Sequence, residues 1–247
     1  MSRDSEKERY KDKTNEIVNR PEIIPGIHNY CDRWCERCTF TSRCTVFLTE
    51  QEMGWNDNLD HENQEFWDKM SLVFESTMEL LSESAKRLGI DLDSLDDEEI
   101  VEHEETEIEQ FAREYSVDIH NWLKKENQFF NDFTVVDENS QKVVSITEAL
   151  EVIEWYSMFI SAKTHRAMYS FQFVKEDEYS LGDSQGSAKI AVIAIERSLT
   201  AFTVLYKQLP RFEDELLGFM VHLEKLKKGI LAIVPGAMEF KRPGFDD

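Results

Sequence analysis

The sequence has few residues that break a helix and lacks long apolar runs. Only nine glycines and five prolines occur in 247 residues. No apolar stretch approaches the roughly 20 residues that a membrane-spanning helix needs. The N-terminus, MSRDSEKERYKDK, also lacks the apolar core of a secretory signal. We therefore expect a cytoplasmic protein with no membrane span.

Basic residues are scarce relative to acidic ones. The chain has 28 lysines and arginines against 50 aspartates and glutamates, giving a formal net charge of -22. Residues 1–50 are balanced, with nine of each sign, so the whole excess lies in residues 51–247. Such a field repels phosphate backbones and anionic membrane surfaces. We therefore expect a protein partner rather than nucleic acid or a membrane. The oligomeric state stays open.

Signatures of α/β enzymes are also missing, because no GxGxxG follows a strand pattern and no βαβ alternation or internal repeat occurs. Apolar residues instead recur every three or four positions, which is typical of amphipathic helices. The sequence therefore predicts an all-α protein, an up-and-down helical bundle of about five long helices with a small N-terminal four-cysteine metal-binding module. The expected helices cover 60–88, 94–125, 145–171, 187–208 and 210–230.

Capping residues and polar stretches set the predicted boundaries. Ser94 is expected to cap the second helix, and a Ser145–Glu148 capping box the third. A short hairpin strand or loop is expected over 126–143, and a polar linker over 175–187. We divide the chain into a charged arm (1–20), the cysteine module (21–52), the helical bundle (53–234) and a C-terminal tail (235–247).

All four cysteines, Cys31, Cys35, Cys38 and Cys44, fall within 14 consecutive residues with the spacing C-x3-C-x2-C-x5-C. In a helix, the first three would share one face. A turn at 39–42 would return the fourth to the others. Cytoplasmic thiols stay reduced, and buried apolar use would scatter cysteines along the chain. The cluster therefore predicts a metal site with these four ligands.

Two metals fit this pattern. A [4Fe–4S] cluster suits ligands from one compact segment and is the favoured interpretation. Structural zinc, which usually takes two separated cysteine pairs, is the alternative. The last two spacings resemble the end of the cluster loop in DNA glycosylases of the endonuclease III type, which implies iron. The first two spacings match radical S-adenosylmethionine enzymes, but these helices cannot form the β/α barrel that such enzymes need.

Charged residues embedded in the apolar central helices form a second candidate site. Glu154 and His165 lie on one face of the helix over 145–171, and Glu196 lies in the apolar run of the next helix. We expect at least one of Glu196 and Arg197 to face the core. Buried charges must be ion-paired or bind a ligand. The alternatives are ion pairs that fix helix register and a carboxylate/histidine metal site.

The catalytic candidates are therefore Glu154, His165 and Glu196, assisted by one of three further side chains on the first two helices: His61, Glu65 or His103. No histidine has a glutamate three positions before it, so the ferritin-like Glu-x-x-His motif is absent.

Three functional hypotheses follow. The first is a metal-binding helical protein, iron–sulfur rather than zinc, with a sensing, electron-transfer or protein-interaction role. The second is a metal-dependent enzyme with a carboxylate/histidine site between the central helices. The third is a structural zinc module on an acidic scaffold protein. Whether the chain is an enzyme is left open by the sequence.

Overall fold

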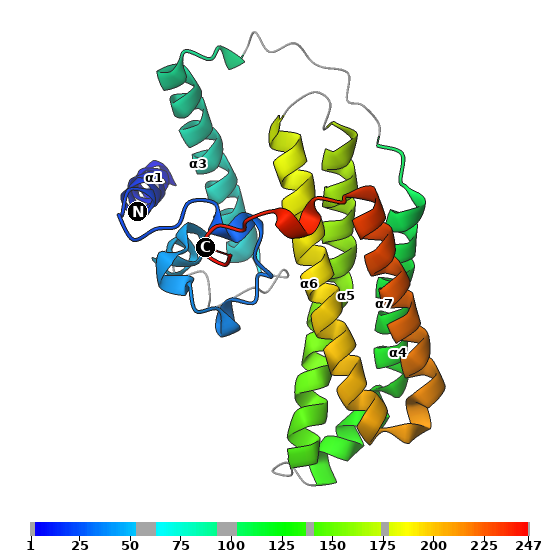
Figure 1. Ribbon diagram of the computed structural model, residues 1–247. Helices are drawn as coiled ribbons and strands as arrows, with labels where there is room; N and C mark the ends of the chain where they lie inside the picture. Colours follow the sequence, from blue (N-terminus) through cyan, green and yellow to red (C-terminus); the bar gives the residue numbers. More distant parts are fainter. Residues whose placement is uncertain (1–2, 53–62, 93–102, 137–140, 174–177, 247) are drawn as a thin grey trace. The chain divides into compact units, whose positions relative to one another are not determined.

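The computed structural model describes residues 3–52, 63–92, 103–136, 141–173 and 178–246. Throughout these ranges the regular elements are helices and no strand occurs, which confirms the predicted all-α class (Figure 1). No helix within them has the length and apolar character needed to cross a membrane. The α-helices are α1 (Arg3–Val18), α2 (Thr45–Glu52), α3 (Gln64–Leu88), α4 (Glu107–Val136), α5 (Gln141–Gln172), α6 (Glu178–Gln208) and α7 (Glu213–Ile233).

The chain forms two compact units. Met1–Glu102 and Pro243–Asp247 make the first, and His103–Arg242 the second. The first unit contains the cysteines together with α1, α2 and α3. Sequence patterning assigned residues 53–234 to one bundle, whereas the structure places α3 with the cysteine-containing unit.

The second unit is a bundle of four helices, α4 to α7, that lie side by side (Figure 1). Short connections between consecutive helices favour this antiparallel arrangement. α5 and α6 make the most extensive contact, since α6 presents buried small residues at helical spacing, including Ala188, Ala191 and Ala194. Small side chains let two helix backbones approach closely. Large apolar residues such as Ile153 and Ile160 of α5 then fill the core.

The expected polar linker over 175–187 is helical from Glu178 onward, so α6 begins about nine residues earlier than predicted. The reason is an ion pair. Asp183 is buried, and its carboxylate accepts hydrogen bonds from Arg166 of α5 and from the hydroxyl of Ser170. A charged residue is tolerated in a helix contact when its partners replace water. Ser187, the first residue of the predicted helix, lies inside α6 and is fully buried.

Other boundaries also differ from expectation. α4 continues to Val136, so the loop or hairpin strand predicted from 126 is wrong for that stretch. α5 begins at Gln141, and Ser145 is not its cap, because its hydroxyl accepts a hydrogen bond from Gln208 of α6. The predicted cap Ser94 lies outside the described residues, and α4 itself begins at Glu107.

Two predicted helices are confirmed closely. α3 ends at Gly89, whose left-handed φ of 73° is the conformation that glycine adopts most easily at a helix end. α7 follows a short 3-10 turn that begins at Pro210. Proline suits the start of a helix because its missing N–H would have no partner there.

The expected N-terminal arm is an ordered helix, α1, that packs on α3. Ion pairs between the two helices hold α1 against α3. Lys7 lies 2.9 Å from Glu79, and Lys11 lies 2.7 Å from Glu83, so a basic stripe of α1 faces an acidic stripe of α3. These pairs raise the pKa of Lys11 above its usual value, chiefly through the hydrogen bond to Glu83.

The end of the chain returns to the first unit. Lys189 of α6 donates a hydrogen bond of 2.7 Å to the carbonyl of Phe240 in the second unit. A few residues later Gly244 adopts a left-handed φ of 75° and lies against Ile24, where a Cβ atom would come within 2.8 Å of the isoleucine. Phe245 then packs edge-on against Phe40, with ring centroids 5.0 Å apart.

Candidate metal centre

The cysteines lie on an irregular loop rather than on a helix. Short 3-10 turns cover Cys35–Arg37 and Thr41–Arg43, so the expectation of three sulfurs on one α-helical face is wrong. The second turn overlaps the predicted 39–42 turn and directly precedes Cys44. Arg33 has a left-handed φ of 59°, which is uncommon for a residue with a side chain. The backbone therefore turns repeatedly within the cysteine segment.

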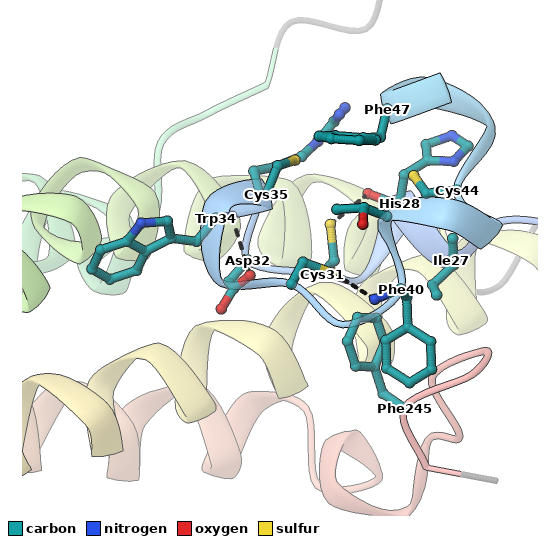
Figure 2. Close-up of a pocket in the computed structure, with 13 residues that line it drawn as sticks. Ile27, His28, Cys31, Asp32, Trp34, Cys35, Phe40, Cys44, Phe47 and Phe245 are labelled. Carbon is teal, nitrogen blue, oxygen red and sulfur yellow. Dashed lines mark hydrogen bonds between the residues drawn. The ribbon is translucent and has the colours of Figure 1, made fainter. Parts of the chain in front are cut away.

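These turns bring all four cysteines to the wall of one pocket (Figure 2). Each cysteine is free and half-buried. The rest of the wall is largely apolar and aromatic and includes side chains from before, within and after the loop: Ile27, Trp34, Phe40, Phe47 and Phe245. The free space is about 20 Å³, close to what one water molecule needs.

Backbone groups contact two of the sulfurs. The N–H of Phe40 donates to the Sγ of Cys38 at 3.4 Å, and the Sγ of Cys31 lies 3.5 Å from the carbonyl of His28 (Figure 2). The first contact suits a negatively charged sulfur, because an N–H group can only donate. Hydrogen bonds of this kind tune the potential of an iron–sulfur cluster.

Burial makes two of the thiols hard to ionise on their own. It raises the pKa of Cys31, and it raises the pKa of Cys35 to about 11, with a further contribution from the neighbouring cysteines. Metal binding requires the thiolate form and releases the proton. A cation at the centre of the pocket would therefore stabilise four charges that the apolar wall otherwise disfavours.

Sulfur spacing bears on the kind of metal. Among the described residues, the ligand atoms that gather within 4.8 Å of one another belong to a different group, and the cysteine sulfurs form no such set. Four sulfurs around one zinc ion at about 2.3 Å would lie about 3.8 Å apart. A cluster of several irons holds its thiolates further apart than that. The sulfurs would therefore have to move closer together to hold a single zinc ion.

His28 lines the same pocket and was not identified from the sequence. Its Nδ1 is buried and has no hydrogen-bond partner among the described residues. Burial, with the charge of Arg33, lowers the pKa of His28 and favours the neutral ring. The signal that could have found it is its place three residues before Cys31, at the edge of the cysteine cluster.

The three arginines of the cysteine segment have separate roles. Arg33 lowers the pKa of Cys31 through its charge, although the effect of burial is larger. The guanidinium of Arg37 stacks over the ring of Trp34 at 3.8 Å. Arg43 donates to the carbonyl of Glu22 at 2.9 Å and so ties the loop to the preceding segment.

The structure separates the catalytic candidates of the central helices. Glu154 and His165 are both on α5, but 11 residues apart, or about 16 Å along the axis. Glu154 is exposed, so the two do not form an internal polar stripe. Glu196 of α6 is also exposed and lies 3.7 Å from Lys227. Arg197 is exposed as well, but its guanidinium donates a hydrogen bond to the hydroxyl of the buried Tyr156. Neither of the last two charges is buried, and Arg197 is the one that contacts a core residue.

The assisting candidates on the first two predicted helices do not form one site either. His61 lies outside the described residues, and Glu65 is an exposed residue of α3 that pairs with Lys69 at 2.9 Å. His103, in contrast, does meet His165, through the carboxylate of Glu109. Glu109 was not identified from the sequence. Its signal was a T-x-x-E capping box at Thr106, which the prediction of an earlier helix start at Ser94 obscured.

Comparison with known proteins gives no match to a family model, to a curated protein or to a solved structure. The function is therefore argued from the geometry of the chain's own residues.

Proposed function

We propose that residues 21–52 form a redox-active metal module in which Cys31, Cys35, Cys38 and Cys44 hold an iron–sulfur cluster. The protein would then act in electron transfer or in sensing. One observation carries this proposal: four free thiols of one compact loop line a single pocket, and ligands from one compact segment suit an iron–sulfur cluster.

The surroundings of the sulfurs support a cluster rather than reactive thiols. The wall of the pocket is largely apolar and aromatic, and the hydrogen bond from the backbone N–H of Phe40 to Cys38 stabilises negative charge on sulfur. Reactive cysteines usually lie in electropositive surroundings that lower the pKa. Burial instead raises the pKa of Cys31 and Cys35. This environment suits ligands that are ionised by the metal they bind.

The small free volume implies that the loop adjusts to its metal. A pocket of about 20 Å³ has room for one small ion, whereas a group of several irons and sulfides enters only if side chains rotate outward. Such adjustment is ordinary, because metal sites are rarely preformed and binding is coupled to folding. We therefore expect the loop over 31–44 to become more ordered when the cluster is assembled.

The acidic charge gives the protein a basis for recognising a partner. The excess lies outside residues 1–50, whose own charges balance. A partner that exchanges electrons with the module, or reads its state, would be a protein with a basic surface.

The test is elemental analysis and the visible spectrum of the full-length protein purified without oxygen. We expect about four irons and four sulfides per chain, with a broad visible absorbance that bleaches with dithionite. Replacing the four cysteines together by serine should abolish the iron and the colour. Ser42→Ala is the matched control, because Ser42 is an exposed residue of the same loop and should leave the iron content unchanged.

One zinc per chain, held by the cysteines and without colour, would overturn the redox proposal and make the module a structural staple. Retention of iron in the quadruple variant would overturn the assignment of its ligands. Circular dichroism of each variant should show the helix content of the wild type, because the bundle over 103–242 is a separate unit.

A further inference from the structure

The bundle contains another group of metal-ligand side chains, outside the cysteine module. His103 lies four residues before the start of α4, Glu109 lies in the first turn of α4, and His165 lies on α5. Two imidazole nitrogens and a carboxylate oxygen from these residues lie within 4.8 Å of one another. Among the described residues, no other group of three histidine, cysteine or carboxylate ligands lies this close together.

Glu109 is held in place by the start of its own helix. One carboxylate oxygen, Oε2, accepts hydrogen bonds from the backbone N–H of Thr106 at 2.8 Å and from its hydroxyl at 2.6 Å. The side chain is only 2% exposed. Burial alone would raise the pKa of Glu109, but the hydrogen bonds from Thr106 and the two histidines outweigh it and lower the pKa. An ionised carboxylate is thus fixed with its second oxygen, Oε1, directed at the histidines.

Both imidazoles approach that one oxygen. Nε2 of His103 lies 2.7 Å from Oε1 of Glu109, and Nδ1 of His165 lies 2.6 Å from it. The two rings meet edge to face, with centroids 5.1 Å apart. The other nitrogen of His103, Nδ1, lies 3.3 Å from Oε1 of Gln172.

The contact with Gln172 is compatible with a His103 ring that carries its proton on Nδ1. When Nδ1 donates its proton to Gln172, a neutral ring directs the lone pair of Nε2 at the carboxylate of Glu109. A lone pair and a carboxylate oxygen at hydrogen-bond distance repel each other unless a cation lies between them. That cation is either a proton on the ring or a metal ion.

We propose that His103, Glu109 and His165 bind a divalent first-row transition metal ion. Two imidazoles and one carboxylate form a donor set that zinc and ferrous iron take in proteins, with the remaining positions open. Metal-binding histidines usually donate their other N–H to an outer partner, and ligating carboxylates are themselves hydrogen-bonded. Gln172 and Thr106 occupy these two places.

The site is open on the side of His165. This side chain is 58% exposed, whereas those of His103 and Glu109 are 12% and 2% exposed. A metal ion could therefore enter from solvent and keep water at its open positions. Such a site could bind a further oxygen-containing ligand, which a closed structural site cannot do.

Metal binding requires only a small rearrangement. Ligand atoms around a tetrahedral ion with bonds of about 2.0–2.1 Å lie about 3.3 Å apart, so the present contacts of 2.6 and 2.7 Å must lengthen. His103 lies in a non-helical segment and His165 is exposed, so both rings can shift while Glu109 stays fixed. The ion would replace protons, and its binding should weaken as the pH falls.

The test is a titration of the full-length protein with Zn²⁺ alone, followed through the imidazole ¹⁵N resonances. We expect Zn²⁺ to shift the resonances of His103 and His165 and to leave those of His120, an exposed histidine of α4, unchanged. The His165→Ala variant should weaken zinc binding at this site by on the order of 100-fold. His120→Ala is the matched control and should bind like the wild type.

Two results would overturn the proposal: zinc that leaves both imidazoles unshifted in the wild type, or zinc bound equally well by His165→Ala. In either case the group is a hydrogen-bonded histidine–carboxylate–histidine network and no more. His165 is exposed, so its replacement should not unfold the bundle, and Glu109→Gln provides a second variant that keeps the size of the side chain. The readout is independent of the cysteine module, because cysteine-bound metal does not shift these imidazoles.

Discussion

The guanidinium of Arg166 on α5 donates hydrogen bonds to both carboxylate oxygens of Asp183 on α6. Nη2 lies 2.6 Å from Oδ1, and Nε lies 3.0 Å from Oδ2. Asp183 is buried, while the arginine side chain is 43% exposed. Two parallel N–H···O bonds make this a geometrically specific pair. It joins the two central helices at the end where α6 begins.

Asp183→Asn should destabilise the protein by about 2 kcal/mol, because it leaves the donors of Arg166 and Ser170 without their charged acceptor. Denaturation in urea measures the change in the free energy of unfolding. Glu196→Gln is the control, since Glu196 is exposed and its partner Lys227 is 3.7 Å away. It should change stability by less than about 0.5 kcal/mol. Equal effects of the two replacements would contradict a structural role for the buried pair.

The same pair should make stability depend on pH. Burial would raise the pKa of Asp183, but the hydrogen bonds from Arg166 and Ser170 outweigh it and lower the pKa below its usual value. The stabilisation by ionised Asp183 is therefore complete above its unfolded pKa of about 3.9. It is lost as the pH falls through the lower pKa of the folded state. Urea denaturation between about pH 7 and pH 2 should show the wild type and Asp183→Asn converging at the acid end. A constant difference would exclude titration of Asp183 as the cause.

Ile153→Ala should destabilise the protein by about 3 kcal/mol, since Ile153 is fully buried and the replacement leaves a cavity. Met158 lies on the same helix and is 74% exposed, so Met158→Ala should stay within about 0.5 kcal/mol of the wild type. Thermal unfolding of both variants compares the two faces of α5. A loss of stability in Met158→Ala as large as that in Ile153→Ala would show that this face is covered.

Thr106→Ala should remove the side-chain half of the capping box and destabilise the protein by about 1 kcal/mol. It should also weaken zinc binding at His103 and His165 by about tenfold, because Thr106 orients the carboxylate of Glu109. Gln110→Ala, at an exposed position one residue after Glu109, is the control. Isothermal titration with Zn²⁺, alongside denaturation, separates the two effects. Unchanged zinc affinity would mean that the backbone N–H of Thr106 suffices to orient Glu109.

Elements with strong local signals could be predicted from the sequence. The apolar spacing up to Leu88 and the stop at Gly89 define α3, and Pro210 marks the turn into α7. Both signals act within one or two helical turns. The cysteine cluster is of the same kind, since its composition alone indicates a shared site, whatever the path of the backbone.

Features that depend on a distant partner could not be predicted. The stretch around Asp183 has the composition of a linker, and its partners Arg166 and Ser170 lie 17 and 13 residues earlier, on α5. Ser145 looks like a cap until Gln208 of α6 is known to donate to it. The pairing of His165 with Glu109 joins residues 56 positions apart, and it depends on how α4 packs against α5.

The return of the chain to its first unit affects the order of assembly. N-terminal regions ordinarily fold first as a chain is synthesised. Here Phe245, which completes the wall around the cysteines, is made only after the whole of residues 103–242. The pocket around the cysteines is therefore complete only after the bundle has been synthesised. If the proposed metal binds there, its insertion is a late, post-translational step.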